Sequence, residues 1–219
     1  MIGIASALSS ELKPFLNILE NKTQKEIMGY IFYSGTINNH SVVLAQSGIG
    51  KMNASSLITL MIEHYDVDLI INSGIAGGFD KNLKTLDSVQ AVRVGCYDIN
   101  MMLDNLPYGC LEEENRFIES NVKCSGVISG LIMTADTFAG NRKALEDVFD
   151  KYYSNEVVYA VDMESYAVAY VCKKYNVEWV VIRSISDVVG QTNQLEAYYN
   201  FPLEASKRSF DIIMKNFFN

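Results

Sequence analysis

One stretch near the C-terminus, Trp179-Val180-Val181-Ile182-Arg183-Ser184-Ile185-Ser186-Asp187, indicates the fold class most directly. It is apolar over the length of a strand, apart from one Arg, and such a run is typical of a strand in a buried sheet. Other apolar runs of strand length alternate with segments of helical period along the whole chain. The sequence therefore predicts an α/β domain with a largely buried sheet.

The predicted elements form a single domain over residues 1–219, because no linker rich in Pro, Gly or Ser divides them. The predicted strands cover residues 2–7, 30–37, 42–46, 69–73, 88–94, 126–134, 157–162 and 179–185. The predicted helices cover residues 10–19, 52–65, 141–153, 164–175 and 195–217. Asn38-Asn39 is typical of a hairpin turn, so we expect a central mixed twisted sheet flanked by helices.

Composition narrows the function classes. Of 219 residues 49% are hydrophobic, and the formal net charge of −8 would repel a nucleic acid. No apolar run reaches membrane-spanning length and no signal-peptide pattern opens the sequence, so we expect a cytoplasmic protein with no membrane partner. Four separated cysteines and two histidines offer no zinc-ligand spacing, so we expect no metal and no cofactor. The scarcity of histidine leaves carboxylates as the natural acid and base.

Acids follow three of the predicted strands, and ligands of open α/β sheets collect beyond the carboxyl ends of strands. Glu11 follows the first strand, Glu164 follows the strand at 157–162, and Asp187 follows the last strand. For Glu11 and Glu164 the alternative of a plain helix-dipole partner stays open, since each stands near the start of a helix. No helix signal follows Asp187 immediately, and its strand contains Arg183, which when buried requires an acidic partner or a substrate.

Two glycine-rich stretches also follow strands. Residues 47–51 (SGIGK) have Ala45 where a phosphate-binding loop needs a glycine, and Met52 where it needs Ser or Thr. Residues 73–78 (SGIAGG) lack the Gly-x-Gly-x-x-Gly spacing of a dinucleotide site. The glycines either let the backbone pass close to a ligand or form tight turns. We expect no nucleotide cofactor at either place.

Six motifs recur in one order over most of the chain: Ile2-Gly3-Ile4 with Glu11, residues 47–51, residues 70–78, Asp136-Thr137-Phe138, Val161-Asp162-Met163-Glu164, and residues 181–187. Each is weak alone, but together they resemble the nucleoside phosphorylase/hydrolase superfamily, and within it the 5′-methylthioadenosine/S-adenosylhomocysteine nucleosidases. The resemblance implies a nucleoside phosphorylase-like fold. It also implies hydrolysis of the N-glycosidic bond of adenine nucleosides, with release of adenine and a ribose derivative, and a place in methionine salvage.

The resemblance implies a role for each matched acid. Asp187, beside Ser186, would protonate or hydrogen-bond N7 of the departing adenine. Glu11, helped by Arg183, would activate the attacking water. Glu164 would hold the ribose hydroxyls.

Other matched positions would shape the pocket. By the same resemblance Met163 would pack on the sugar, Phe138 would stack on the base, and the main chain near Ala139 would read the edge of the base. Ile49 would lie towards the 5′ substituent. Tyr198, in an aromatic run, would cap the pocket, unless it packs on the core as part of a helix face.

Cleavage of an N-glycosidic bond calls for groups of this kind. Positive charge develops on the sugar and negative charge on the base, so an acid must meet the base and an anion must lie near the ribose. Asp187 can act as an acid near neutral pH only if burial raises its pKa, whereas Glu11 must be ionised to accept a proton from water. We therefore expect the two carboxyl groups to occupy different environments.

Water is favoured over phosphate as the second substrate. The related phosphorylases hold phosphate with arginines and a serine, where this chain has Ala5-Ser6-Ala7, Asn72 and Ile75. An anion pocket is missing from these positions, and the acid at Glu11 would add repulsion. Hydrolysis is therefore the predicted reaction.

The chain departs from the family pattern at Ile75, where the hydrolases commonly carry Ser, and at residues 94–98, where they carry an aromatic-His-Asp segment. Residues 95–115 read as an excursion that covers a site or a partner surface, or as a disordered loop. Two alternative functions remain open: a purine nucleoside phosphorylase or a nucleosidase for another purine riboside, and a non-catalytic ligand-binding protein on the same fold. The family resemblance implies a homodimer that binds a small-molecule nucleoside.

Overall fold

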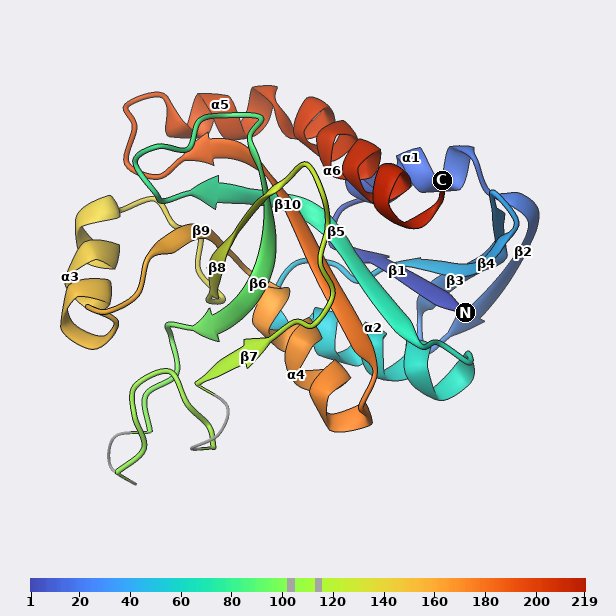
Figure 1. Cartoon of the computed structure of the whole chain (residues 1–219), viewed down its shortest axis with the longest axis horizontal. Helices are drawn as coiled ribbons and strands as arrows, with labels where there is room; N and C mark the ends of the chain where they lie inside the picture. Colours follow the sequence, from blue (N-terminus) through green and yellow to red (C-terminus); the bar gives the residue numbers. More distant parts are fainter. Residues whose placement is uncertain (102–104, 113–115) are drawn as a thin grey trace.

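A computed structural model describes residues 1–101, 105–112 and 116–219 (Figure 1). The strands are β1 (Ile2–Ser6), β2 (Glu20–Ile27), β3 (Tyr30–Ile37), β4 (His40–Gln46), β5 (Leu69–Gly78), β6 (Ser88–Cys96), β7 (Phe117–Glu119), β8 (Ile128–Thr134), β9 (Val158–Asp162) and β10 (Glu178–Val188). The helices are α1 (Ser9–Asn17), α2 (Lys51–His64), α3 (Arg142–Tyr152), α4 (Ser165–Tyr175), α5 (Gln194–Asn200) and α6 (Pro202–Phe217). The prediction of a single α/β domain with a mixed sheet is confirmed.

Five strands of the sheet close into a ring. Among the described residues the strand order is β10-β6-β8-β9-β5-β1-β4-β3-β2, with β7 paired to β6, and β10 also pairs with β5. The ring therefore consists of β5, β10, β6, β8 and β9. Its register sets Asp187 of β10 and Val161 of β9 on either side of Gly77 of β5, so the ends of these three strands meet at one place.

Helices cover both faces of the sheet, which explains why its central strands are apolar without alternation. On one face Ile70 of β5 and Val181 of β10 pack with buried residues of α2 and α4. On the other face Ile71 and Val180 pack with α1 and α6. Figure 1 shows these two helix pairs on opposite sides of the sheet, with α3 beside the ring. The core thus fixes β5 and β10, the strands that carry part of the site.

The predicted hairpin turn at Asn38-Asn39 is confirmed, but the strand that precedes this hairpin was not predicted. Asn38 and Asn39 have φ of 46° and 66°, the left-handed values of a tight turn between β3 and β4. No strand was predicted at Glu20–Ile27, yet β2 pairs with β3 at the edge of the sheet. Its side chains are exposed except for half-buried Ile27, so it has no apolar pattern to detect.

Two further predictions need correction. The strand predicted to end at residue 73 runs on to Gly78 as β5, so of the two alternatives left open for the glycines at residues 73–78 the tight turn is wrong. The predicted helix over residues 195–217 is broken at Phe201, where α5 ends and α6 begins. Pro202 occupies the first turn of α6, where its missing N–H costs nothing, and it could not lie inside a continuous helix without losing a hydrogen bond.

The excursion at residues 95–115 is described in part, since residues 102–104 and 113–115 lie outside the described residues. Within the described portion Tyr108 stacks on Tyr152 of α3, with ring centroids 4.0 Å apart. Tyr153, which follows α3, donates a hydrogen bond of 2.7 Å to the carbonyl of Cys96. In the part of the chain that the structure covers, no helix is long and apolar enough to cross a membrane.

Candidate active site

A pocket with about 610 Å³ of empty space, its open mouth included, lies where β5, β9 and β10 end. Apart from Arg183, every residue that the sequence analysis assigned to the site lines it: Glu11, Ile49, Ile75, Phe138, Ala139, Met163, Glu164, Ser186, Asp187 and Tyr198. The fold thus brings residues from the whole length of the chain to one cavity.

Glu11 lies in the first turn of α1 with 2% of its surface exposed. One carboxylate oxygen accepts a hydrogen bond of 2.8 Å from the N–H of Leu8, and the other accepts one of 2.9 Å from the N–H of Ile75. Burial raises the pKa of Glu11, while these N–H donors and the charge of Arg183 partly oppose the rise. Glu11 therefore caps the start of its helix, which fits the alternative of a helix-dipole partner, and it also faces the pocket.

Asp187 lies near the end of β10, just after a bulge in its pairing with β5. Ser186 Oγ donates a hydrogen bond of 2.6 Å to one carboxylate oxygen. Gln194 Nε2, at the start of α5, donates one of 2.8 Å to the other. Burial raises the pKa of Asp187 against the effect of these two donors. The bulge turns both Ser186 and Asp187 towards the pocket region, where an unbroken strand would alternate them.

Glu164 directly precedes α4, but its side chain makes no capping bond to that helix. Instead Oε1 accepts a hydrogen bond of 2.9 Å from the N–H of Gly50, the residue before α2. Gly50 has a φ of 97°, so the glycine permits the backbone conformation that presents this N–H. Burial, followed by the negative charge of Asp162, raises the pKa of Glu164 to about 7. This geometry does not support the alternative that Glu164 is a plain helix-dipole partner.

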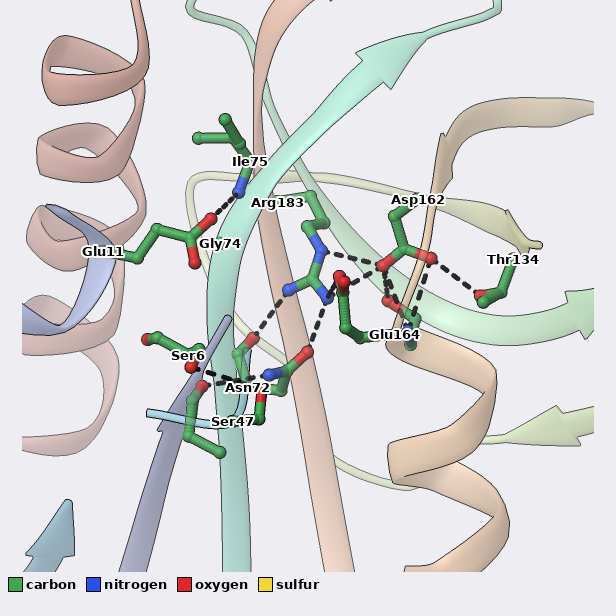
Figure 2. A network of polar contacts seen from close by, with 12 residues as sticks. Ser6, Glu11, Ser47, Asn72, Gly74, Ile75, Thr134, Asp162, Glu164 and Arg183 are labelled. Carbon is green, nitrogen blue, oxygen red and sulfur yellow. Dashed lines mark hydrogen bonds and ion pairs between the residues drawn. The ribbon is translucent and has the colours of Figure 1, made fainter. Parts of the chain in front are cut away.

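Arg183 is 1% exposed and is held by a network beneath the pocket (Figure 2). Its Nε donates to Asp162 Oδ2 at 2.9 Å, and Nη2 lies 2.8 Å from the same oxygen. Nη2 also donates to Asn72 Oδ1 at 2.5 Å and lies 3.8 Å from Glu164 Oε2. Asp162 is fixed in turn by Thr134 Oγ1 at 2.7 Å. The acidic partner that a buried Arg requires is thus Asp162.

Gly74 separates Arg183 from Glu11. A Cβ built on Gly74 would lie 3.0 Å from Glu11 Oε1 and 3.1 Å from Arg183 Nη1, so both groups lie directly against this bare backbone. The guanidinium donates hydrogen bonds to Asp162, Asn72 and Ile182, and its positive charge opposes the rise in the pKa of Glu11 across the glycine. Arg183 therefore acts on Glu11 through the electrostatic field at this position.

Aromatic and aliphatic side chains form the wall of the pocket. Phe138 and Tyr198 meet edge to face, with ring centroids 5.2 Å apart, and Phe138 is 42% exposed. Ile49, from the loop before α2, is 48% exposed at the mouth. Met163 lies between Asp162 and Glu164 in the chain and lines the same cavity. An apolar wall with a few convergent polar groups is typical of a small-molecule site.

The environments of the two principal acids differ less than expected. Burial raises the pKa of Glu11 as well as that of Asp187, so the direction of the change does not separate a base from an acid. What distinguishes them is the set of donors: main-chain N–H groups and a nearby cation for Glu11, and uncharged side chains for Asp187. No Lys or Arg occurs among the described residues that line the pocket.

Sequence reasoning missed two residues. Asp162 had a signal, since a buried Arg needs an acid and Asp162 ends the strand two residues before Glu164. Gln194 had none, because it lies in the polar run Gly190-Gln191-Thr192-Asn193-Gln194 and nothing there marks one amide for burial. In the structure Gln194 is 6% exposed and lines the pocket.

Known proteins are similar to this chain in both sequence and fold. A family model described as "Phosphorylase superfamily" matches residues 1–217. A curated relative from Bacillus thuringiensis (strain Al Hakam), named 5′-methylthioadenosine/S-adenosylhomocysteine nucleosidase, is 31% identical over 230 residues, which cover 98% of this chain and 96% of the relative.

Solved structures of such nucleosidases superimpose on the chain over nearly its full length. The S. pneumoniae enzyme with a transition-state inhibitor, MT-ImmA, has a TM-score of 0.88 at 28% identity, covering 97% of this chain and 96% of that one. The Streptococcus pneumoniae enzyme in complex with 8-aminoadenine has a TM-score of 0.89 at 28% identity, with the same coverage. The chain therefore belongs to the phosphorylase superfamily and, within it, to the family of the 5′-methylthioadenosine/S-adenosylhomocysteine nucleosidases.

Proposed function

We propose that the protein hydrolyses the N-glycosidic bond of adenine nucleosides, 5′-methylthioadenosine and/or S-adenosylhomocysteine, to adenine and a ribose derivative. The observation that carries this proposal is the grouping of three buried carboxyl groups, those of Glu11, Glu164 and Asp187, at one largely apolar pocket in a member of this family. Two of them can divide the acid and base work, and the third can hold the sugar.

Asp187 acts on the leaving base. As the C1′–N9 bond breaks, its electron pair moves onto the purine, and a proton from Asp187 to N7 neutralises the developing negative charge. The raised pKa of Asp187 favours the protonated form that this step needs. Ser186, at 2.6 Å, fixes the orientation of the carboxyl group.

Glu11 acts on the water. The water oxygen adds to C1′ as Glu11 accepts one of its protons, so that the sugar leaves with a new hydroxyl group. A raised pKa makes Glu11 a stronger base, and the N–H groups of Leu8 and Ile75 hold its two oxygens in place. The ionised carboxylate also stabilises positive charge on the ribose ring.

Glu164 binds the ribose hydroxyl groups as their acceptor. The N–H of Gly50 donates a hydrogen bond to its Oε1, and Arg183 lies 3.8 Å from Oε2, so the carboxylate is held in one orientation. Arg183 and Asp162 are positioning residues in this scheme, because they support Glu164 from beneath the pocket.

Product analysis tests the reaction. The protein is incubated with 5′-methylthioadenosine, S-adenosylhomocysteine, deoxyadenosine and adenosine, and released adenine is measured in phosphate-free buffer and again with phosphate. We expect equal release in both buffers and a free ribose derivative as co-product. A ribose 1-phosphate product would instead make the protein a phosphorylase, and binding without turnover would make it a ligand-binding protein.

We further propose that the protein is a cytoplasmic homodimer and that its reaction belongs to methionine salvage, as the family resemblance implies. The half-exposed Ile49 at the mouth and the exposed Met52 nearby on α2 offer apolar surface that a second copy would cover. Light scattering at working concentration should give twice the mass of the chain, and a monomer would contradict the dimer.

A further inference from the structure

The amide of Gln194 makes three hydrogen bonds inside the pocket. Its Nε2 donates to Asp187 Oδ2 at 2.8 Å and to the carbonyl of Ala139 at 2.9 Å. Its Oε1 accepts from the N–H of Gly190 at 2.9 Å. Two acceptors lie at one end of the amide and an N–H donor lies at the other, so the first end is the NH₂ group and the second is the carbonyl oxygen. One NH₂ group therefore satisfies two acceptors of the pocket at once.

The same two acceptors suit the amino group of adenine. In the proposed function Asp187 meets N7 of the base, and the family resemblance implies that the main chain near Ala139 reads the edge of the base. The 6-amino group stands next to N7 on that edge, and, like the amide of Gln194, it is a planar NH₂ with two hydrogens to donate. Adenine bound through this edge would place its amino nitrogen within hydrogen-bonding distance of both Asp187 Oδ2 and the carbonyl oxygen of Ala139.

We propose that Gln194 holds the place of the adenine amino group until the base binds, and that it must withdraw from Asp187 and Ala139 to admit the base. This inference rests on the proposed function. Gln194 is the first residue of α5, and Tyr198, one turn later, contacts Phe138 over the same pocket. Release of the amide therefore frees the end of α5 that lies over the base.

The placeholder has a chemical consequence for affinity. Adenine exchanges one NH₂ for another at the two acceptors, so part of its binding free energy is spent on displacing Gln194. Unsubstituted purine has no amino group, and it can enter while Gln194 stays bonded to Asp187 and Ala139. Removing the amide should therefore favour adenine and leave purine nearly unchanged.

Titration calorimetry with adenine and with unsubstituted purine tests this, using the wild-type chain and Gln194→Met, which keeps the length of the side chain without its donors. The loss of one buried hydrogen bond corresponds to up to about a tenfold change in affinity, so Gln194→Met should bind adenine up to about tenfold more tightly. Purine should change by less than about twofold on the same argument. Gln191→Met, the same change at an exposed position three residues earlier, is the control and should match the wild type for both ligands.

Steady-state kinetics adds a second readout. Gln194→Met should lower KM for 5′-methylthioadenosine without raising kcat, because the amide competes with the base and takes no part in bond cleavage. Equal or weaker adenine binding in both Gln194→Met and Gln194→Ala, or an equal gain for adenine and purine, would overturn the placeholder. The alanine variant is included because its side chain is too short to fill the subsite itself.

The two proposals fail in different ways. If the wild-type protein hydrolyses the nucleosides and binds adenine, but the ratio of adenine to purine affinity is the same in Gln194→Met, the placeholder alone is refuted. If the wild-type protein neither binds adenine nor releases it from a nucleoside, the proposed function is refuted and the placeholder with it.

Discussion

Glu164→Gln should make the stability of the protein less sensitive to pH. Burial and Asp162 raise the pKa of Glu164 to about 7 in the folded chain, against an ordinary value of 4.5. Between these two values the unfolded chain releases the proton and the folded chain keeps it, so the free energy of unfolding falls as pH rises. Below pH 4.5 this loss is absent, and it is complete only above pH 7.

The size of the effect follows from the pKa difference. A rise from 4.5 to about 7 corresponds to about 3 kcal/mol, at about 1.36 kcal/mol for each pKa unit. Most of this, roughly 2 to 3 kcal/mol, falls between pH 5 and pH 8, where the comparison is practical. Glutamine cannot ionise, yet its oxygen can still accept the hydrogen bond from Gly50. The variant should therefore gain on the wild type by about that amount over this pH range.

Urea unfolding at pH 5, 6, 7 and 8 measures the difference in unfolding free energy between variant and wild type. A constant offset, from the lost attraction to Arg183, does not affect the slope of this difference with pH. Glu26→Gln, on the exposed edge strand β2, is the control and should run parallel to the wild type. A flat or falling difference for Glu164→Gln would refute the reasoning, because it would mean that Glu164 is ionised in the folded chain throughout.

Three other substitutions probe the site. Asp187→Asn should reduce turnover by about 10²- to 10⁴-fold in an adenine-release assay, because the acid is lost while the shape is kept. Gly74→Ala should reduce kcat/KM about tenfold, since the new methyl group lies 3.0 Å from Glu11 Oε1 and 3.1 Å from Arg183 Nη1 and these groups must give way by a few tenths of an ångström. Arg183→Met should lower the unfolding free energy by about 3–5 kcal/mol in urea, because it leaves Asp162 buried without its cation.

Each of these has its own point of failure. Unchanged turnover in Asp187→Asn removes Asp187 from the mechanism, and Asp211→Asn on the exposed side of α6 serves as its control. Wild-type kinetics in Gly74→Ala would mean that Glu11 and Arg183 can yield to a methyl group without cost. Unchanged stability in Arg183→Met would mean that burying Asp162 without its cation does not lower the free energy of unfolding.

The central strands and the acids at their ends could be read from the sequence, because both faces of the sheet are covered. Residues such as Ile70, Ile71, Val180 and Val181 pack in two separate cores, so the strands appear as unbroken apolar runs whose ends are easy to locate. Strand β2 could not be found in this way, since it is stabilised by pairing with β3 alone and its side chains face water.

The remaining errors have local causes. The glycines at residues 73–78 suggested a turn, but Gly74 is bare because Glu11 and Arg183 lie against it within a strand. The break at Phe201 was marked by Pro202, whose ring disfavours a helical conformation in the residue before it. Gln194 could not be recognised, because its burial depends on a loop conformation and three hydrogen bonds that no residue pattern encodes.

The ring of strands also bears on how the chain folds as it is synthesised. Strand β10 lies between β5 and β6, yet it follows the end of β6 by 82 residues, from Cys96 to Glu178. At ribosomal rates of about 5–20 residues per second, the nascent chain holds β5 and β6 with unpaired edges for about 4 to 16 s. Unpaired apolar edges invite pairing with other chains, so this interval is when a chaperone would protect the protein most. The strand that ends the exposure also carries Asp187, so the lining of the pocket is complete only after this interval.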